Sequence, residues 1–586
     1  MLKTLLKQLK EFTFTAIISP IWMIGEVICE MIIPILMGKI VDIGIGTDEV
    51  PGDMNYIAKT GIIMVIVAAF GLLCGCMGGV TRSKASAGFA RNLRKAMHDN
   101  IQSFSFANID KFSTSGLVTR LTTDVTNIQN AFMMILSMAV RAPMSMIVAM
   151  IMSYYLSPRI ASIYLIAVIL LGIVMLFLMR STTRYFKKVF ERYDALNESV
   201  QENVSAIRVV KAYVREDFEN DKFKKAASNI YEMFVKAEKK LAKISPIMMG
   251  TVYVCILLIS WVGAHMIVSD TLTTGALMSL LTYCMNILMS LMMVSMVFVM
   301  ITMSEASAKR ISEVIEEKST LTNPENPVME VKDGSVVFDH AYFAYKDDAK
   351  EPVLKDINLS IKSGETIGII GSTGSAKSSL VSLISRLYDV TKGRVLVGGL
   401  DVREYDMEVL RNQVAVVLQK NELFSGTIYE NLRWGNPNAT DEECKKACDQ
   451  ACASEFIEKM PQGYNTYIEQ GGSNVSGGQK QRLCIARALL KKPKILILDD
   501  STSAVDTATD AKIRQAFAQE IPNTTKFIIA QRISSVQNCD RIIVMDNGTV
   551  NDFGSHEELI ARNPIYREVY ESQTGANGDA DFDEKN

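Results

Sequence analysis

The sequence predicts two joined halves: an all-α membrane domain of six transmembrane helices with long cytoplasmic extensions, followed by an α/β P-loop domain. Three observations support this fold class. Long apolar stretches end by Met303, strand-like and helix-like segments alternate from Met329 onward, and a glycine-rich segment at 371–379 joins an apolar strand to a helix. The expected divisions are residues 1–310 for the membrane domain, 311–327 for a linker, 328–573 for the α/β domain and 574–586 for a disordered acidic tail.

Length and composition limit what the chain can be. Its 586 residues are too many for one hydrophobic core and suit about two to four domains. The formal net charge of −2 provides no general field for nucleic acid, so no nucleic-acid partner is expected. Apolar residues make up 48% of the chain, which is high for a soluble protein of this size, and the ten cysteines are scattered without a C-x-x-C pair, as in a reducing compartment.

Six stretches are long and apolar enough to cross a bilayer, which takes about 20 residues each. They are approximately Thr15–Val41, Tyr56–Val80, Ala131–Leu156, Ile160–Met179, Pro246–Val268 and Ala276–Met303. Charge predicts their orientation, because Thr81–Thr123 carries seven Lys or Arg and two acids, whereas Val41–Thr60 carries four acids and one lysine. By the positive-inside rule, the long connections and both termini are cytoplasmic.

The long cytoplasmic connections carry helical patterns, each with one local break. The breaks lie at Ser105–Phe112 and near Ser205–Glu219. Each predicts either a solvated turn or a short helix that docks on a soluble domain.

Ionisable residues within the spans indicate a functional cavity, because a charge in a bilayer is costly. Glu26 and Glu30 share one face of the first span, and Arg141 lies at a similar depth in the third. We expect Arg141 to pair with one of the two glutamates and to leave the other facing a wet cavity; the alternative is that all three are solvated there. A flexible methionine stripe on the last span predicts a pliable wall of that cavity, or else ordinary packing or lipid contact: Met278, Met285, Met289, Met292, Met296, Met300 and Met303.

The α/β half centres on a strand, a glycine-rich turn and a helix that together can cradle phosphates. Backbone N–H groups and the positive end of the helix dipole converge on one spot, which suits a triphosphate. Lys377 can reach the β- and γ-phosphates, and the Ser378 hydroxyl can ligate Mg²⁺. The candidate nucleotide-binding residues are Gly371, Ser372, Thr373, Gly374, Ser375, Ala376, Lys377, Ser378 and Ser379. Ala376 stands where the motif has its last glycine.

Further polar groups follow other predicted strands. Gln419 comes after Val414–Leu418 and can touch Mg²⁺ or water, while Asp499 and Asp500 end Lys494–Asp500 and can hold Mg²⁺ and orient or deprotonate an attacking water. Gln531 ends a further apolar strand. A second glycine turn precedes the helical run Lys480–Leu490 and predicts a second anion site, which suggests a nucleotide held by another chain; its residues are Ser476, Gly477, Gly478 and Gln479. Tyr345 can stack on adenine or pack in a core.

These residues resemble those of ATP-binding cassette (ABC) exporters over essentially the whole chain. The resemblance implies that the phosphate loop is a Walker A motif, that Gln419 is the Q-loop glutamine, and that Ser476–Gln479 belongs to the signature. It further implies that Asp499 is the Walker B aspartate, that Asp506 is the D-loop aspartate, and that Tyr345 stacks on adenine. In such exporters two chains sandwich two ATP molecules between each Walker A and the opposite signature, with Mg²⁺, and the two breaks would be coupling helices.

Three departures from the family pattern separate this chain from its typical members. Asp500 replaces the catalytic glutamate, Gln531 the switch histidine, and Ala376 a Walker A glycine. The pattern resembles the weak-site subunit of heterodimeric bacterial multidrug exporters. The implied protein lies in the bacterial inner (plasma) membrane with its nucleotide-binding domain in the cytoplasm, in contact with membrane lipids.

The same resemblance implies a partner and a cargo. The partner would be a second, different half-transporter carrying Glu and His at the two altered catalytic positions, and the cargo a small amphipathic compound. Alternatives are a homodimeric exporter of lipid or peptide, and an ATP-gated regulator that does not pump.

Overall fold

The computed structural model describes residues 1–47, 50–346, 349–500 and 506–574. The chain forms two compact units. The first combines Met1–Gln102 with Thr114–Glu317, and the second combines Ser103–Ser113 with the chain from Lys318 onward. The acidic tail predicted at 574–586 lies, except for Thr574, outside the described residues.

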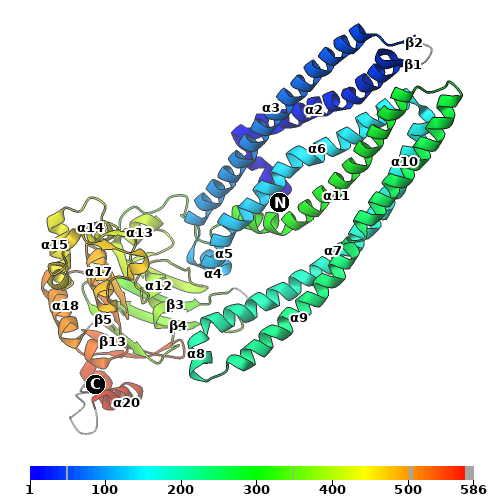
Figure 1. The fold of residues 1–586 in the computed structure, drawn as a ribbon. Helices are drawn as coiled ribbons and strands as arrows, with labels where there is room; N and C mark the ends of the chain where they lie inside the picture. The colour runs from blue at the N-terminus through cyan, green and yellow to red at the C-terminus, as the bar shows by residue number, and fades with distance from the viewer. Residues whose placement is uncertain (48–49, 347–348, 501–505, 575–586) are drawn as a thin grey trace. The chain divides into compact units, whose positions relative to one another are not determined.

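The first unit consists of long helices (Figure 1). Its helices are α1 (Leu2–Leu6), α2 (Thr13–Lys39), α3 (Met54–Gln102), α5 (Thr114–Thr119), α6 (Val125–Leu156), α7 (Pro158–Ser205), α8 (Ile207–Ala212), α9 (Glu216–Leu241), α10 (Ile244–Val268) and α11 (Thr274–Glu316). A two-stranded hairpin, β1 (Gly46–Thr47) and β2 (Val50–Pro51), joins α2 to α3 through residues of which two are not described. Six helical segments of the described chain are long and apolar enough to span a membrane, which confirms the predicted number.

The spanning helices run well beyond their apolar stretches, as predicted for the cytoplasmic extensions. α3 continues from the predicted second span to Gln102, and α7 continues to Ser205. The predicted break at Ser105–Phe112 contains the short helix α4 (Phe106–Phe112), and the break near Ser205–Glu219 contains α8. Both breaks are therefore short helices rather than irregular turns.

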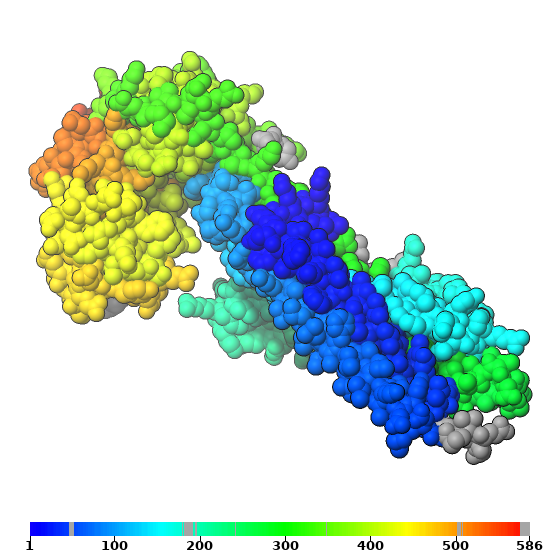
Figure 2. All heavy atoms as spheres, turned by 90° about the horizontal axis from the view of Figure 1, so that it is seen from above, coloured from blue at the N-terminus to red at the C-terminus, as the bar shows by residue number. Residues whose placement is uncertain are grey.

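α2 and α3 approach closely where glycines lie between them, and Figure 2 shows the dark-blue atoms of the first part of the chain against the lighter-blue atoms that follow. A Cβ atom at Gly71 would lie 3.1 Å from the Cys29 Cβ, and one at Gly25 would lie 3.2 Å from the Cys74 Sγ. A side chain at either position would press on the facing cysteine, which would have to move by a few tenths of an ångström. Such close approach suits membrane helices, because they associate through van der Waals contact rather than hydrophobic exclusion.

The second unit contains two main sheets. The larger has strand order β14-β13-β5-β12-β11-β8, and β13, β5, β12, β11 and β8 run parallel. The smaller is antiparallel with order β4-β3-β6-β7. The strands are β3 (Val336–Phe343), β4 (Leu354–Ile361), β5 (Thr366–Gly371), β6 (Lys392–Val397), β7 (Leu400–Asp401), β8 (Val414–Val417), β9 (Gly426–Thr427), β10 (Tyr467–Ile468), β11 (Ile495–Asp499), β12 (Thr525–Ile529), β13 (Arg541–Asp546) and β14 (Thr549–Gly554).

Helices cover the larger sheet and complete the predicted α/β architecture. They are α12 (Lys377–Ile384), α13 (Met407–Gln413), α14 (Ile428–Leu432), α15 (Asp441–Gln450), α16 (Ser454–Ile457), α17 (Gly477–Leu489), α18 (Thr507–Glu520), α19 (His556–Arg562) and α20 (Pro564–Thr574). The central strands are buried along their length, as in β11 and β12, because helices pack against a parallel sheet on both faces. The carboxyl ends of β5, β12, β11 and β8 therefore form one edge that carries the polar residues following them.

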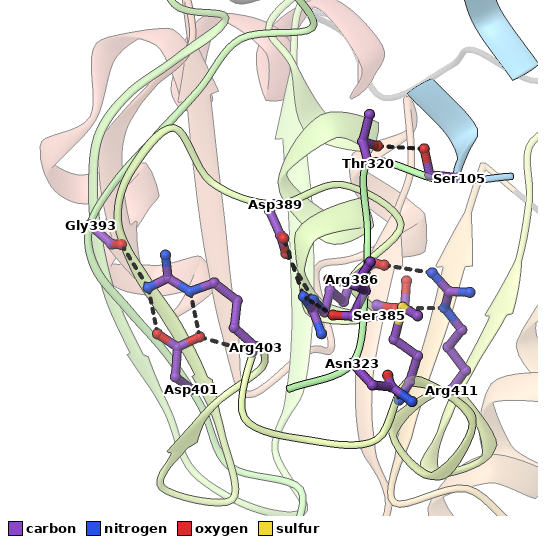
Figure 3. A network of polar contacts seen from close by, with 12 residues as sticks. Ser105, Thr320, Asn323, Ser385, Arg386, Asp389, Gly393, Asp401, Arg403 and Arg411 are labelled. Atoms are coloured by element: carbon purple, nitrogen blue, oxygen red, sulfur yellow. Dashed lines mark hydrogen bonds and ion pairs between the residues drawn. The ribbon is translucent and has the colours of Figure 1, made fainter. Parts of the chain in front are cut away.

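The segment predicted as a linker, residues 311–327, begins inside a helix. α11 continues through Glu316, so the first residues of 311–327 are helical. The remainder belongs to the second unit, where the Arg386 guanidinium donates to the Thr322 carbonyl at 3.1 Å. Arg386 also donates to Asp389 at 2.9 Å (Figure 3). Because Arg411 in turn donates to the Arg386 carbonyl at 2.7 Å, this stretch is anchored rather than loose.

Candidate functional site

The phosphate-binding turn lies between β5 and α12, as the sequence predicts. A Cβ atom at Gly371 would lie 2.3 Å from the Met545 carbonyl oxygen, so only glycine fits where the turn leaves the sheet. Gly374 has φ +87°, a conformation that glycine adopts freely. Ala376 has φ 70° and ψ 25°, which places an alanine in the left-handed region immediately before the helix. The alanine that replaces the motif's last glycine therefore sits in a conformation that favours glycine.

Lys377 is folded back over its own turn. Its Nζ donates to the Gly371 and Ser372 carbonyl oxygens, each at 2.8 Å. Burial lowers the pKa of Lys377, while the nearby Asp499 and Asp500 carboxylates oppose that shift. An ammonium group held by backbone carbonyls of the turn can exchange these contacts for the oxygens of a phosphate.

Asp499 and Ser378 are adjacent and suit a magnesium ion. The Ser378 hydroxyl donates to Asp499 Oδ1 at 3.0 Å, and Asp499 is buried at the end of β11. Burial raises the pKa of Asp499, and the neighbouring Asp500 charge acts in the same direction. A hydroxyl and a carboxylate are oxygen ligands of the kind that Mg²⁺ prefers when phosphates supply the others, so these residues fit Mg²⁺ bound with a nucleotide.

Asp500 and Gln531 contact each other directly. The Gln531 Nε2 donates to Asp500 Oδ2 at 2.9 Å. They meet because β11 and β12 are parallel neighbours, with Asp499 opposite Ile529, so the residues that follow each strand emerge side by side. Asp500 also has a positive φ of 47°. The sequence indicated both residues as functional candidates but carried no signal for their contact, which follows from the pairing of these two strands.

Tyr345 belongs to an aromatic cluster that reaches both the phosphate turn and α4. Its hydroxyl shares a 2.8 Å hydrogen bond with the Ser379 hydroxyl, and 49% of the residue is exposed, so its ring is accessible to a base. The Tyr388 ring stands perpendicular to the Tyr345 ring at 5.2 Å. The Tyr388 hydroxyl donates to Asp110 Oδ2 of α4 at 2.7 Å. The sequence carried no signal for Tyr388, because it follows no strand and matches no motif.

The second glycine turn begins α17. Ser476 accepts a hydrogen bond from the Gln479 backbone N–H at 3.3 Å, and the Gln479 side chain accepts one from the Ser476 N–H at 2.9 Å. This capping box directs the first turn of the helix, with Gly477 and Gly478, towards solvent. An exposed helix start of this kind is suited to an anion that the rest of the described unit does not supply.

Asp506 and Gln419 lie on other elements of the unit. Asp506 caps α18 by accepting from the Thr509 N–H at 2.9 Å, and hydrogen bonds from Thr509 hold the pKa of Asp506 below its usual value. Gln419 follows β8 and is exposed, and two strands, β12 and β11, separate β8 from β5 in the sheet. In the described part of the chain no hydrogen bond joins it to Lys377 or Ser378, so its role stays a prediction.

The charged residues of the first unit are arranged differently from the prediction. Arg141 donates to both glutamates, with Nη1 2.8 Å from Glu26 Oε1 and Nη2 2.9 Å from Glu30 Oε2. The expectation that one carboxylate would be left without the arginine is therefore wrong: a guanidinium has a two-pronged donor set that spans two carboxylates on successive helical turns. All three residues line a cavity of about 510 Å³.

The methionine stripe lies on an exposed side of α11 within this unit. The exposed fractions of Met285, Met289, Met292 and Met296 lie between 42% and 57%, and Met300 is partly exposed. Packing in the core of the unit is therefore excluded for these methionines. Their role as a cavity wall stays a prediction.

Comparison with known proteins agrees with this arrangement. Residues 17–292 match the model of the ABC transporter transmembrane region, and residues 354–503 match the model of the ABC transporter. An uncharacterised ABC transporter ATP-binding protein of Bacillus subtilis, YfiB, is 35% identical over 570 residues, covering 97% of this chain and 98% of that protein.

Two further comparisons concern a named relative and a fold. The ATP-dependent lipid A-core flippase of Desulfotalea psychrophila is 32% identical over 477 residues, covering 81% of this chain and 82% of that protein. The structure of a bacterial Atm1-family ABC exporter with ATP bound has the same fold, with a TM-score of 0.81 and 24% identity, covering 97% of this chain and 99% of that one.

The match extends from the membrane helices through the phosphate turn, and a membrane domain precedes a nucleotide-binding domain on one polypeptide. The chain therefore belongs to the ABC transporters and is an exporter half-transporter, an ATP-hydrolysing translocase with a cytoplasmic nucleotide-binding domain.

Proposed function

We propose that this chain is the weak-site subunit of a heterodimeric exporter that moves amphipathic compounds out of the cytoplasm or the inner leaflet. Its own Walker site, with Lys377, Ser378 and Asp499, binds Mg²⁺ and ATP but hydrolyses it slowly. Its signature turn, Ser476–Gln479, completes the faster site, whose Walker motifs belong to the partner. The partner carries Glu and His at the positions that correspond to Asp500 and Gln531.

The observation that carries this proposal is the pair formed by Asp500 and Gln531. An aspartate carboxylate is one methylene shorter than that of glutamate, and misplacement of a catalytic group by about 1 Å can cost on the order of 100-fold in rate. Gln531 lies 2.9 Å from Asp500 and occupies one of its oxygens. A glutamine amide can hydrogen-bond a phosphate but cannot carry the positive charge that a histidine can.

Membership of the family supports dimer formation, whereas the cargo is proposed from the membrane domain and from one relative. ABC exporters generally form dimers, and the exposed start of α17 is available for a nucleotide bound by a second chain. The exposed methionines of α11 suit a pliable wall for compounds of varied shape. A lipid cargo is a second candidate, favoured by the similarity to a protein named as a lipid A-core flippase.

The test restores the two altered residues. In Asp500→Glu/Gln531→His, ATP turnover at this chain's own site is expected to rise at least about tenfold, as the longer carboxylate reaches the attacking water. Single-turnover hydrolysis is measured with the partner's catalytic glutamate changed to glutamine, so that only the weak site contributes. Adding Lys377→Ala to the restored chain is the matched control and should abolish the gain. Unchanged turnover in the restored chain would falsify the weak-site assignment.

A further inference from the structure

A pocket inside the membrane domain carries fixed charges that have no role in nucleotide chemistry. It lies between α2, α3 and α6 and has a volume of about 510 Å³. Its walls combine apolar side chains, such as Met23, Ile33 and Leu72, with the charged groups of Glu26, Glu30, Arg141 and Arg82. The mixture suits a molecule with an apolar body and a charged head.

The centre of the pocket has one negative charge in excess. Two carboxylates, Glu26 and Glu30, share the single guanidinium of Arg141 through Oε1 of the first and Oε2 of the second. The other oxygen of each carboxylate has no hydrogen-bond donor among the described residues. A Cβ atom at Gly75 would lie 3.2 Å from the Glu26 Cδ, so the absence of a side chain there lets the carboxylate lie against α3. Excess negative charge in a low-dielectric site favours an incoming cation.

A complementary positive charge stands at the cytoplasmic side of the same pocket. Arg82 lines it from α3, and its Nε is buried without a hydrogen-bond partner among the described residues. No ion pair forms with it in that part of the chain either. A buried donor without a partner is costly, and an anion would satisfy it.

The two charged centres are separated by a distance that one headgroup can bridge. Arg82 follows Gly75 by seven positions, a rise of about 10 Å along the helix. Side chains of an α-helix lean towards its N-terminus, so the Arg82 side chain leans back towards Gly75 and the carboxylates, which shortens this gap.

From these charges we infer that the pocket binds the head of a zwitterionic amphipath. Its ammonium group lies against the free oxygens of Glu26 and Glu30, its phosphate or carboxylate lies on Arg82, and its apolar chain follows Met23 and Leu72. Either a membrane phospholipid with an amine headgroup or a soluble single-chain zwitterion has this chemistry. The part this pocket plays in export rests on the proposed function, whereas its ligand preference does not.

Binding to the purified full-length chain in nanodiscs, without nucleotide, tests the inference. The fluorescent probes are acyl-labelled phosphatidylethanolamine and a labelled single-chain alkylphosphocholine, which carry both charges, acyl-labelled phosphatidylglycerol, which carries only the phosphate, and a labelled alkyltrimethylammonium. At least one zwitterion is expected to bind at least about tenfold more tightly than both singly charged probes, since each charge-assisted hydrogen bond contributes separately. Which zwitterion binds more tightly identifies the source as the membrane or the cytosol.

Substitutions in the pocket test which charged residues cause the preference for zwitterionic probes. Glu30→Gln is expected to reduce zwitterion affinity to that of phosphatidylglycerol, and Arg82→Gln to that of the alkylammonium probe. The conservative variants Glu30→Asp and Arg82→Lys should retain part of the preference, which separates lost charge from lost folding. Glu305→Gln and Arg159→Gln, two exposed residues outside the pocket, are matched controls and should bind as the unaltered chain does.

Two results would overturn the inference: equal binding of zwitterionic and singly charged probes, or a preference that survives both Glu30→Gln and Arg82→Gln. Transport of the preferred probe into inside-out vesicles with external ATP is a separate readout. Selective binding without ATP-driven uptake would refute the proposed export and leave the ligand chemistry standing.

Discussion

At the scale of single residues, Ala376 adopts a backbone conformation that costs conformational free energy in the nucleotide-binding turn. Its φ of 70° lies in the left-handed region, where an L-residue loses about 1–2 kcal/mol relative to the right-handed helix. Ala376 is the residue immediately before α12, so its conformation sets the direction in which the helix leaves the turn. The residue therefore stores strain at the nucleotide site.

Ala376→Gly is expected to stabilise the nucleotide-binding domain by about 0.5–1 kcal/mol, because relief of the strain exceeds the added entropy of the unfolded glycine. Differential scanning calorimetry of the full-length chain, compared at the transition that ATP raises, measures the effect. Ala511→Gly, at an exposed helical position of α18, is the control and should destabilise by about 1 kcal/mol. A lower transition temperature in Ala376→Gly than in the unaltered chain would contradict the strain argument.

At the scale of elements, α4 is built into the nucleotide-binding unit rather than merely touching it. Ser105 shares a 2.6 Å hydrogen bond with Thr320, and Asn108 donates to the Lys318 carbonyl at 3.1 Å (Figure 3 shows the first contact). Asp110 accepts from Tyr388, whose ring contacts the accessible Tyr345 ring. These contacts connect α4 to the residue proposed to stack on adenine.

Tyr388→Phe should weaken communication through this chain of contacts and leave catalysis itself in place. Burial and the Asp110 contact raise the pKa of Tyr388, so its hydroxyl remains protonated and able to donate throughout the physiological range. We expect stimulation of ATP hydrolysis by a transported compound to fall about threefold to tenfold, a coupling change of about 0.5–1.5 kcal/mol. The basal rate of ATP hydrolysis should change less than about twofold, because this rate does not depend on coupling to a transported compound.

The matched control for this prediction is Tyr467→Phe, which removes an exposed hydroxyl from β10. Its stimulation should equal that of the unaltered chain. A Tyr388→Phe chain in which basal and stimulated rates fall by the same factor would indicate general damage to the site and not a loss of coupling.

At the scale of the whole molecule, patterns of local origin predicted most of the fold. The six spans and the strand before Gly371 follow from apolar runs, and the starts of α12 and α17 follow from glycine turns, because each is decided by neighbouring residues. Contacts between residues far apart in the sequence could not be predicted in this way, because they depend on which strands and helices are neighbours in the fold. Asp500 meets Gln531 only because β12 lies beside β11, and the depth of Arg141 in its span did not reveal that one guanidinium contacts two glutamates.

The proposed division of labour between two chains also belongs to the scale of the whole molecule. The residues proposed to hold nucleotide and the residues that cap α17 all lie in the described second unit, and the start of α17 faces solvent. Under the proposed function, the binding turn and the signature turn of one chain serve two different nucleotides, and the partner's faster site compensates for the weak site of this chain.

The most direct test is steady-state ATP hydrolysis by the purified full-length chain alone, compared with the same chain assembled with its co-purifying partner in the same nanodiscs. The account predicts that the chain alone is slower by on the order of 100-fold, the cost of a catalytic carboxylate displaced by about 1 Å. Brisk hydrolysis by the chain alone, at a rate comparable to that of the assembly, would contradict it.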